Sequence, residues 1–105
     1  MRFDPDVRGR LRRDLMRRGL TLATLLSQVL AGQRPPALAA LLAARPGMRP
    51  EELLRLALDQ IEARRKLLDT GDDRYGRCDA CGIDLGAAAL GEMPWADRCA
   101  AHAAM

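Results

Sequence analysis

Apolar residues in the first third of the chain recur every three or four positions, which is the period of a helix with one buried face. The residues that share this face are Val7, Leu11, Leu15, Leu22, Leu25, Leu26 and Val29. Asp6 has a side chain that can cap the first turn, and Gly32 favours an end shortly after Leu30. The pattern therefore predicts one long helix from about Asp6 to Leu30.

A second, shorter helical segment is bounded by prolines and a glycine. Pro35 and Pro36 suit the first turn of a helix, and residues 37–44 are only alanine and leucine, which have high helix propensity. Pro46 and Gly47 predict its end. We expect this segment to pack on the longer helices, and exposure of it would imply a partner.

A third segment shows the same helical period from Pro50 onwards. A proline followed by Glu51 and Glu52 suits a first turn, where the helix dipole favours negative charge, and Gly71 predicts the end. Its apolar face continues as Leu54, Leu58, Ile61 and Leu68. Together with the first helix, it predicts an antiparallel helical hairpin of two helices of roughly 20 to 24 residues, each about 30 to 36 Å long.

The composition favours an all-α fold. Of the 105 residues, 49% are hydrophobic but only 3% are aromatic, so the apolar residues are mostly leucine and alanine. We divide the chain into a helical region at residues 1–71 and a metal-binding module at residues 72–105. No apolar run reaches the roughly 18 residues of a membrane span, and the arginine-rich start lacks the apolar run of a signal peptide. We therefore expect a soluble, cytoplasmic protein.

The strongest chemical pattern uses every cysteine and the only histidine of the chain. They form two pairs of identical spacing, Cys78 with Cys81 and Cys99 with His102. A tetrahedral Zn²⁺ needs four nitrogen or sulfur donors, and two short pairs joined by a loop supply them. Gly82, directly after the first pair, suits the sharp turn of a zinc knuckle. Four protein donors close such a site, so we expect a structural zinc ion and no enzyme.

Other interpretations of these residues remain open at this point. A redox-active C-x-x-C motif would use only the first pair, and a disulfide framework would leave one of the three cysteines unpaired. His102 alone would more often be a surface or packed histidine, but its position three residues after Cys99 favours a ligand.

Six arginines between residues 8 and 18 raise the question of a nucleic-acid site. On a helix, only Arg10, Arg13 and Arg17 gather on one outward face. No aromatic side chain for base stacking lies among them, and acidic residues are interspersed. We therefore interpret this face as solvated or as a contact for a protein partner, with nucleic-acid binding as the less favoured alternative.

Aromatic and acidic residues flank the proposed ligands. Tyr75 lies three residues before Cys78, and Trp95 lies four before Cys99, so their rings are candidates to shield the metal–thiolate bonds from water. Asp72 and Asp73 are expected to cap a turn or to form local ion pairs.

The residues around the cysteines resemble the zinc finger of the DksA/TraR family. The segment from Asp72 to Gly82, DDRYGRCDACG, is similar to the first half of that finger. The second half agrees at Leu85, Leu90, Pro94 and Ala96. The resemblance is specific over residues 72–102 and extends more loosely to the preceding helices. It implies a bacterial transcription regulator that binds RNA polymerase, inserts a coiled-coil tip into the secondary channel and alters initiation, often together with ppGpp.

Three departures from the family pattern bear on this expectation. His102 replaces the usual fourth cysteine, and Glu92 replaces an alanine. The acidic tip motif of the family is missing, because residues 31–50 contain no Asp or Glu and only Arg34, Arg45 and Arg49 as charged residues. The Coulomb interaction of such a tip with the catalytic Mg²⁺ region is reversed in sign. We therefore expect an altered or lost secondary-channel activity, with an adaptor protein that binds an unrelated partner as the alternative.

Overall fold

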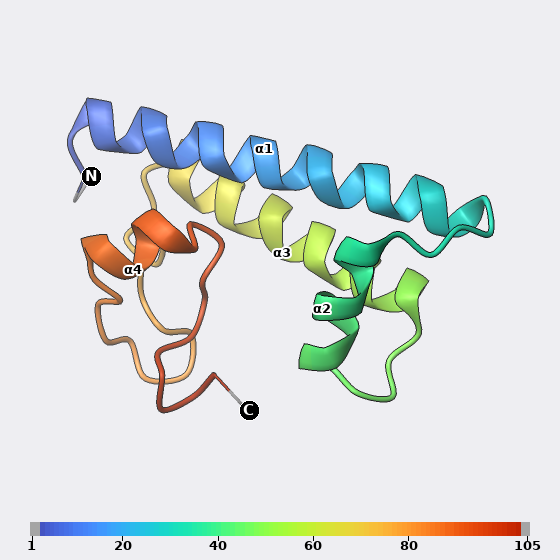
Figure 1. Ribbon diagram of the computed structural model, residues 1–105. Coiled ribbons are helices and arrows are strands. Elements are labelled where there is room, and N and C mark those ends of the chain that lie inside the picture. Colours follow the sequence, from blue (N-terminus) through green and yellow to red (C-terminus); the bar gives the residue numbers. More distant parts are fainter. Residues whose placement is uncertain (1–2, 104–105) are drawn as a thin grey trace.

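The computed structural model describes residues 3–103 and is built almost entirely of helices and loops (Figure 1). The four helices are α1 (Pro5–Leu30), α2 (Pro36–Ala44), α3 (Pro50–Asp69) and α4 (Ala87–Glu92). Within residues 3–103 there is no strand, only an isolated bridge between Arg77 and Asp84. The all-α prediction is confirmed for this part of the chain. The outer ends of the predicted segments 1–71 and 72–105, at residues 1–2 and 104–105, lie outside it.

The start of α1 differs from the sequence prediction. Asp4, and not Asp6, is the N-cap: its Oδ1 accepts a hydrogen bond of 3.0 Å from the backbone N of Val7. Pro5 occupies the first helical position, where its fixed φ suits the helix and its missing N–H costs nothing. Asp6 lies in the first turn, where its carboxylate faces the positive end of the helix dipole. The earlier start makes α1 26 residues long, longer than expected.

Helices α1 and α3 lie side by side and run in opposite directions (Figure 1). Near the start of α1, the Nη2 of Arg8 donates to the backbone O of Asp69 at 2.7 Å, and the Nε of Arg12 lies 3.2 Å from the Asp69 carboxylate. Asp69 is the last residue of α3, so these contacts join opposite helix ends. The ends of α1 and α3 are thereby held in register.

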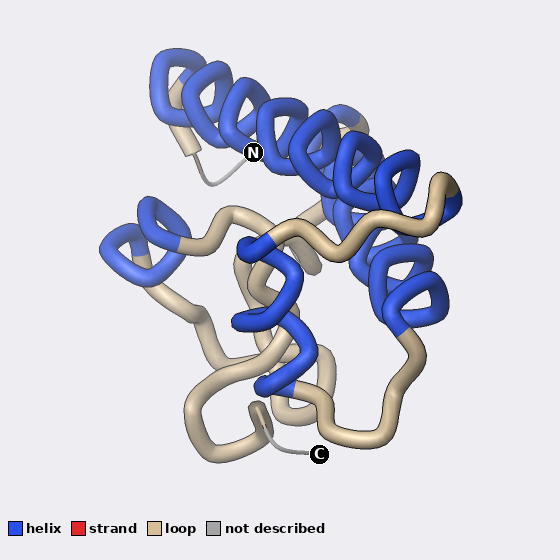
Figure 2. Tube along the Cα trace, turned by 45° about the vertical axis from the view of Figure 1, so that its right-hand side comes forward, coloured by secondary structure: helices blue, strands red, loops and turns tan. Residues whose placement is uncertain are grey.

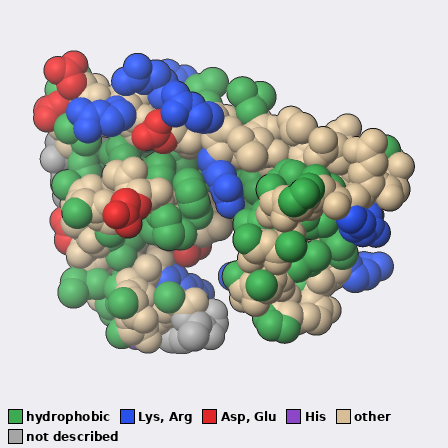
Figure 3. All heavy atoms as spheres, in the orientation of Figure 1, with side chains coloured by type: hydrophobic (Ala, Val, Ile, Leu, Met, Phe, Trp, Pro, Cys, Tyr) green, Lys and Arg blue, Asp and Glu red, His purple; other side chains and the backbone are tan. Residues whose placement is uncertain are grey.

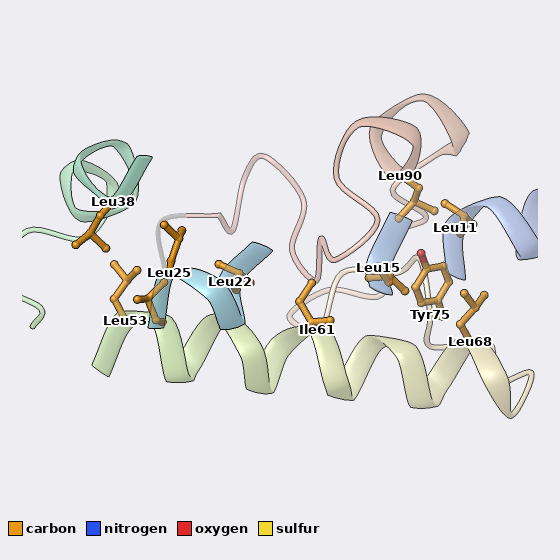
Figure 4. Close-up of a cluster of buried hydrophobic side chains, with 11 residues drawn as sticks. Leu11, Leu15, Leu22, Leu25, Leu38, Leu53, Ile61, Leu68, Tyr75 and Leu90 are labelled. Carbon is orange, nitrogen blue, oxygen red and sulfur yellow. The ribbon is translucent and has the colours of Figure 1, made fainter. Parts of the chain in front are cut away.

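One apolar core runs along the helix pair and continues into the C-terminal segment (Figure 4). Its buried members are Leu11, Leu15, Leu22, Leu25, Leu38, Leu53, Leu54, Ile61, Leu68, Tyr75 and Leu90. Tyr75 and Leu90 come from the segment after α3, and both are fully buried. Leu38 extends the core at the opposite end (Figure 4). The C-terminal segment is therefore part of the same hydrophobic core as the helices.

Helix α2 sits at the end of the molecule that lies away from α4 (Figure 1). It carries no polar side chain, yet Leu38 is its only buried residue. Figure 3 shows apolar side chains over the surface of α2. The prediction that α2 packs on the longer helices is confirmed for its leucines, since Leu38 is buried and Leu41 and Leu42 pack against the core, while its alanines face solvent. Within residues 3–103, no helix has the length and apolar character that a membrane span requires.

Replacing Leu15 tests the shared core. Leu15 is fully buried, so Leu15→Ala removes apolar burial and leaves a cavity, and we expect a loss of about 2 to 5 kcal/mol in the free energy of unfolding. Leu20→Ala is the matched control, because Leu20 lies on the same helix with 71% of its surface exposed. Urea unfolding followed by circular dichroism measures both. Equal stability of the two variants would contradict this description of the core.

Candidate metal centre

The three cysteines and the histidine converge in the C-terminal segment, which apart from α4 consists of loops (Figure 2). Their donor atoms all lie within 4.8 Å of one another. The two sulfur atoms of Cys81 and Cys99 are 3.8 Å apart. His102 Nδ1 lies 3.1 Å from the sulfur of Cys99 and 3.7 Å from that of Cys78. Disulfide-bonded sulfur atoms lie about 2 Å apart, so the cysteines are free thiols. Such a cluster can hold one metal ion through four protein atoms.

The first pair of ligands sits on a tight hydrogen-bonded turn. The backbone N of Gly82 donates to the O of Cys78 at 2.8 Å, and the N of Cys78 donates to the O of Ile83 at 2.9 Å. Gly82 has a φ of 75°, in the left-handed region that favours glycine. A Cβ at Gly82 would meet nothing within 4 Å, so backbone conformation and not space requires glycine here. The prediction of a sharp turn after Cys81 is confirmed.

The second pair of ligands is tied to the first through the backbone. The N of Asp79, between the first two cysteines, donates to the O of Asp97 at 2.8 Å, two residues before Cys99. The N of His102 donates to the O of Cys99 at 3.0 Å, which closes the second turn. A backbone hydrogen bond therefore joins the two turns.

Cys78 is the buried member of the cluster, and its surroundings favour the thiolate. Burial acts to raise the pKa of this thiol, but hydrogen bonds from the backbone of Cys99, Cys81 and Ala80 outweigh burial and lower the pKa to about 6. At Cys81 the backbone of Ile83 lowers the pKa, yet burial and the neighbouring thiols raise it overall. Because the thiolate is the metal-binding form, Cys78 is prepared as a ligand.

Tyr75 and Trp95 both contact residues near or in α1, and Tyr75 also contacts the C-terminal segment itself. The hydroxyl of Tyr75 donates to the O of Pro94 at 2.8 Å, and its ring meets Phe3 edge to face with centroids 5.7 Å apart. The guanidinium of Arg18 lies 4.7 Å from the centre of the Trp95 ring. Shielding of the metal ligands by these rings stays a prediction. Their described contacts instead attach the metal-binding segment to α1.

Arg64 is the residue that sequence reasoning missed. It belongs to α3, yet it contacts Asp79 between the first two cysteines. One signal was present in the sequence: position 64 lies three residues after Ile61 and four before Leu68, so an arginine interrupts the apolar face. The partner of this arginine could not be foreseen, because it depends on how the C-terminal segment docks on α3.

The other predicted charged residues lie apart from the metal ligands. Arg10, Arg13 and Arg17 are exposed on α1, and of these only Arg17 has a carboxylate nearby within residues 3–103, that of Asp14 at 3.9 Å. Lys and Arg side chains gather over the first half of α1 (Figure 3). These three arginines therefore form a separate surface.

The expected local role is confirmed for Asp72. Its carboxylate accepts from the side chain of Arg74 at 2.8 Å and from the backbone N of Arg74 at 2.9 Å. These two hydrogen bonds lower the pKa of Asp72 to about 2. Asp73 is exposed, and its backbone O accepts from Arg77.

Removing single ligands tests the cluster. We expect Cys78→Ser and Cys99→Ser each to lose most of the bound metal and to unfold the segment after α3, because ligation and folding are coupled there. His102→Cys should retain the metal. Elemental analysis after gel filtration measures the metal content. The control is Ala100→Ser, because Ala100 is exposed and lies next to Cys99. Unchanged metal content in both cysteine variants would rule out the cluster as a metal site.

Comparison of the chain with protein-family models, with curated proteins and with solved structures finds no match.

Proposed function

We propose that the protein is a zinc-stabilised regulator, similar to proteins of the DksA/TraR family, that acts by binding RNA polymerase. The observation that carries this proposal is the Cys₃His cluster in a segment that packs on the end of an antiparallel helix pair. The spacing around the ligands provides the family resemblance, and the helices provide a scaffold of the kind that the family uses.

The distances between donors favour zinc as the metal. In a tetrahedral zinc site, Zn–S bonds of about 2.3 Å and Zn–N bonds of about 2.0 to 2.1 Å place sulfur atoms about 3.8 Å apart and sulfur and nitrogen about 3.5 Å apart. The observed separations are 3.8 Å between Cys81 and Cys99, and 3.1 and 3.7 Å from His102 to two sulfur atoms. Thiolate with imidazole is also a typical donor set for zinc. The four residues therefore fit Zn²⁺ without a large rearrangement.

A zinc ion held by these four residues has a structural role. Three thiolates and one imidazole fill the tetrahedron, which leaves no position for a water molecule or a substrate. Function then depends on the surfaces that the fold presents. This argument supports a binding protein over an enzyme.

The surface at the α2 end differs in character from the acidic tip of the family. Residues 31–50 contain no carboxylate, and Arg34 and Arg45 are exposed without an ion pair among the described residues. Arg49 lies 3.7 Å from Glu52. An apolar helix with cations beside it favours acidic protein surfaces and disfavours approach to bound Mg²⁺. We therefore propose polymerase binding with an altered effect on initiation.

Co-purification with bacterial RNA polymerase core enzyme tests this function. We expect the zinc-loaded protein to bind the polymerase stoichiometrically, and Arg34→Glu combined with Arg45→Glu to weaken binding about tenfold or more through like-charge repulsion. A matched control is Arg55→Glu combined with Lys66→Glu, two exposed cations on α3. Binding is measured by gel filtration and by surface immobilisation, with and without ppGpp. A zinc-loaded protein that does not bind the polymerase would overturn the proposal.

A second candidate function is that of an adaptor that binds an unrelated protein through α1. The favouring observation is on this helix: Arg12 has a carboxylate partner, whereas Arg10 and Arg13 have no ion pair within residues 3–103. On the same helix, Leu20 and Met16 are 71% and 52% exposed. Exposed apolar residues beside unpaired cations suit an acidic amphipathic partner.

The arginine surface gives a test that separates a protein partner from nucleic acid. Arg10→Gln, Arg13→Gln and Arg17→Gln are combined in one variant, and binding to a DNA duplex and to a single-stranded RNA is measured at about 50 and 200 mM salt. We expect no binding that depends on both salt and these arginines, since a nucleic-acid site would lose affinity steeply with salt. Salt-sensitive binding that the triple variant abolishes would replace the adaptor with a nucleic-acid-binding function.

A further inference from the structure

Arg64 occupies a position on α3 where an apolar residue would be expected. It lies on the face of Leu54, Ile61 and Leu68, which are buried against α1 and the C-terminal segment. Within residues 3–103 it is the only buried charged residue, with 6% of its surface exposed. Burial of a cation is unfavourable unless it is paired, so this arginine needs a specific partner.

The partner of Arg64 is a residue of the first ligand turn. Nη2 of Arg64 donates to both carboxylate oxygens of Asp79, at 2.9 and 2.7 Å. Asp79 directly follows Cys78, and its backbone N donates to the O of Asp97 near Cys99. Asp79 therefore links three parts of the molecule: helix α3, the first ligand turn and the loop that leads to the second turn.

The two members of this ion pair differ in how much they depend on it. The side chain of Asp79 is 45% exposed and has access to water, whereas that of Arg64 is 7% exposed. Nε and Nη1 of Arg64 are buried and have no hydrogen-bond partner in the described part of the chain. If the ligand turn moves away, the guanidinium loses the only carboxylate that it contacts within residues 3–103 and stays buried. Packing of α3 is thus sensitive to the position of Asp79.

We propose that Arg64 is a positioning residue of the metal centre. Through Asp79 it holds the Cys78–Cys81 turn against α3, so that metal binding and docking of the C-terminal segment form one coupled equilibrium. The proposal rests on the metal site described above and is independent of the partner protein.

Two physical arguments support this coupling. A metal ion bound to Cys78 and Cys81 restricts the same turn that Arg64 holds from the side of the helix, and each constraint lowers the entropy cost of the other. The sign of the charge also fits. Three thiolates and Zn²⁺ carry a net charge of −1, which attracts the guanidinium of Arg64. Contacts of this kind beyond the ligands commonly change metal affinity by about 10-fold to 100-fold.

Substitutions at both members of the pair test the proposal. Zinc affinity is measured by competition with a chromophoric chelator, and unfolding by urea is measured with and without zinc. We expect Arg64→Met to weaken zinc binding about tenfold or more while the zinc-free protein is no less stable, because an apolar side chain of similar size replaces a buried cation. A merely structural ion pair would not separate these two readouts.

Asp79→Asn leaves the buried guanidinium without a carboxylate, so it should weaken zinc binding and also lower stability. The double variant should bind zinc no more weakly than Arg64→Met alone, because both changes remove the same interaction. Arg64→Lys keeps the cation, and we expect its zinc affinity to lie between those of the wild type and Arg64→Met. The control is Glu51→Gln, which breaks the exposed Arg55–Glu51 ion pair of 3.0 Å near the start of α3, and zinc affinity should stay unchanged.

The outcomes distinguish this proposal from the others. Unchanged zinc affinity in Arg64→Met and Asp79→Asn, with normal zinc content in the wild type, would overturn the positioning role alone. Strictly additive losses in the double variant would also overturn it. A wild-type protein without zinc would overturn both the metal site and this inference, whereas failure to bind RNA polymerase bears on neither.

Discussion

The burial of Tyr75 is the interaction on which the rest of the C-terminal segment depends. Its ring fills the end of the core between α1 and α3, and its hydroxyl donates to the backbone of Pro94. Tyr75 lies three residues before the first ligand pair, and Pro94 lies five residues before the second. One side chain therefore fixes the starting points of both metal-binding turns. The buried Leu90 and the Arg64–Asp79 ion pair add to this attachment further along the segment.

The ion pairs within residues 3–103 are of two kinds, exposed pairs and one pair with a buried member, and they differ in their effect on the fold. Exposed pairs such as Arg55 with Glu51, at 3.0 Å, lie in high dielectric and contribute little to stability. The pair of Arg64 and Asp79 is different, because one member is removed from water. Removal of one partner alone would leave a buried charge uncompensated, which is costly. A small protein with few aromatic residues gains a defined arrangement of its parts in this way.

The helices and the clustering of the three cysteines with His102 were predictable from the sequence because both depend on local spacing. The period of the leucines located α1 and α3, and two pairs of identical spacing located all four donors. Errors arose where several weak local signals compete. Asp4 and Asp6 are both possible caps, and Pro5 decides between them by its place in the first turn. Helix α4 has six residues, too few to show a period, and Leu90 is its only buried member.

The four candidate ligands differ in burial, so the cluster has one side that faces solvent and one that faces the interior. Cys78 is buried beneath the segment, whereas Cys81 on the same turn is exposed to solvent. A chelator or an oxidant in solution therefore reaches the sulfur of Cys81 before that of Cys78. Asp79 lies between these two cysteines, so the contact with α3 is made between the exposed and the buried sulfur of the same turn.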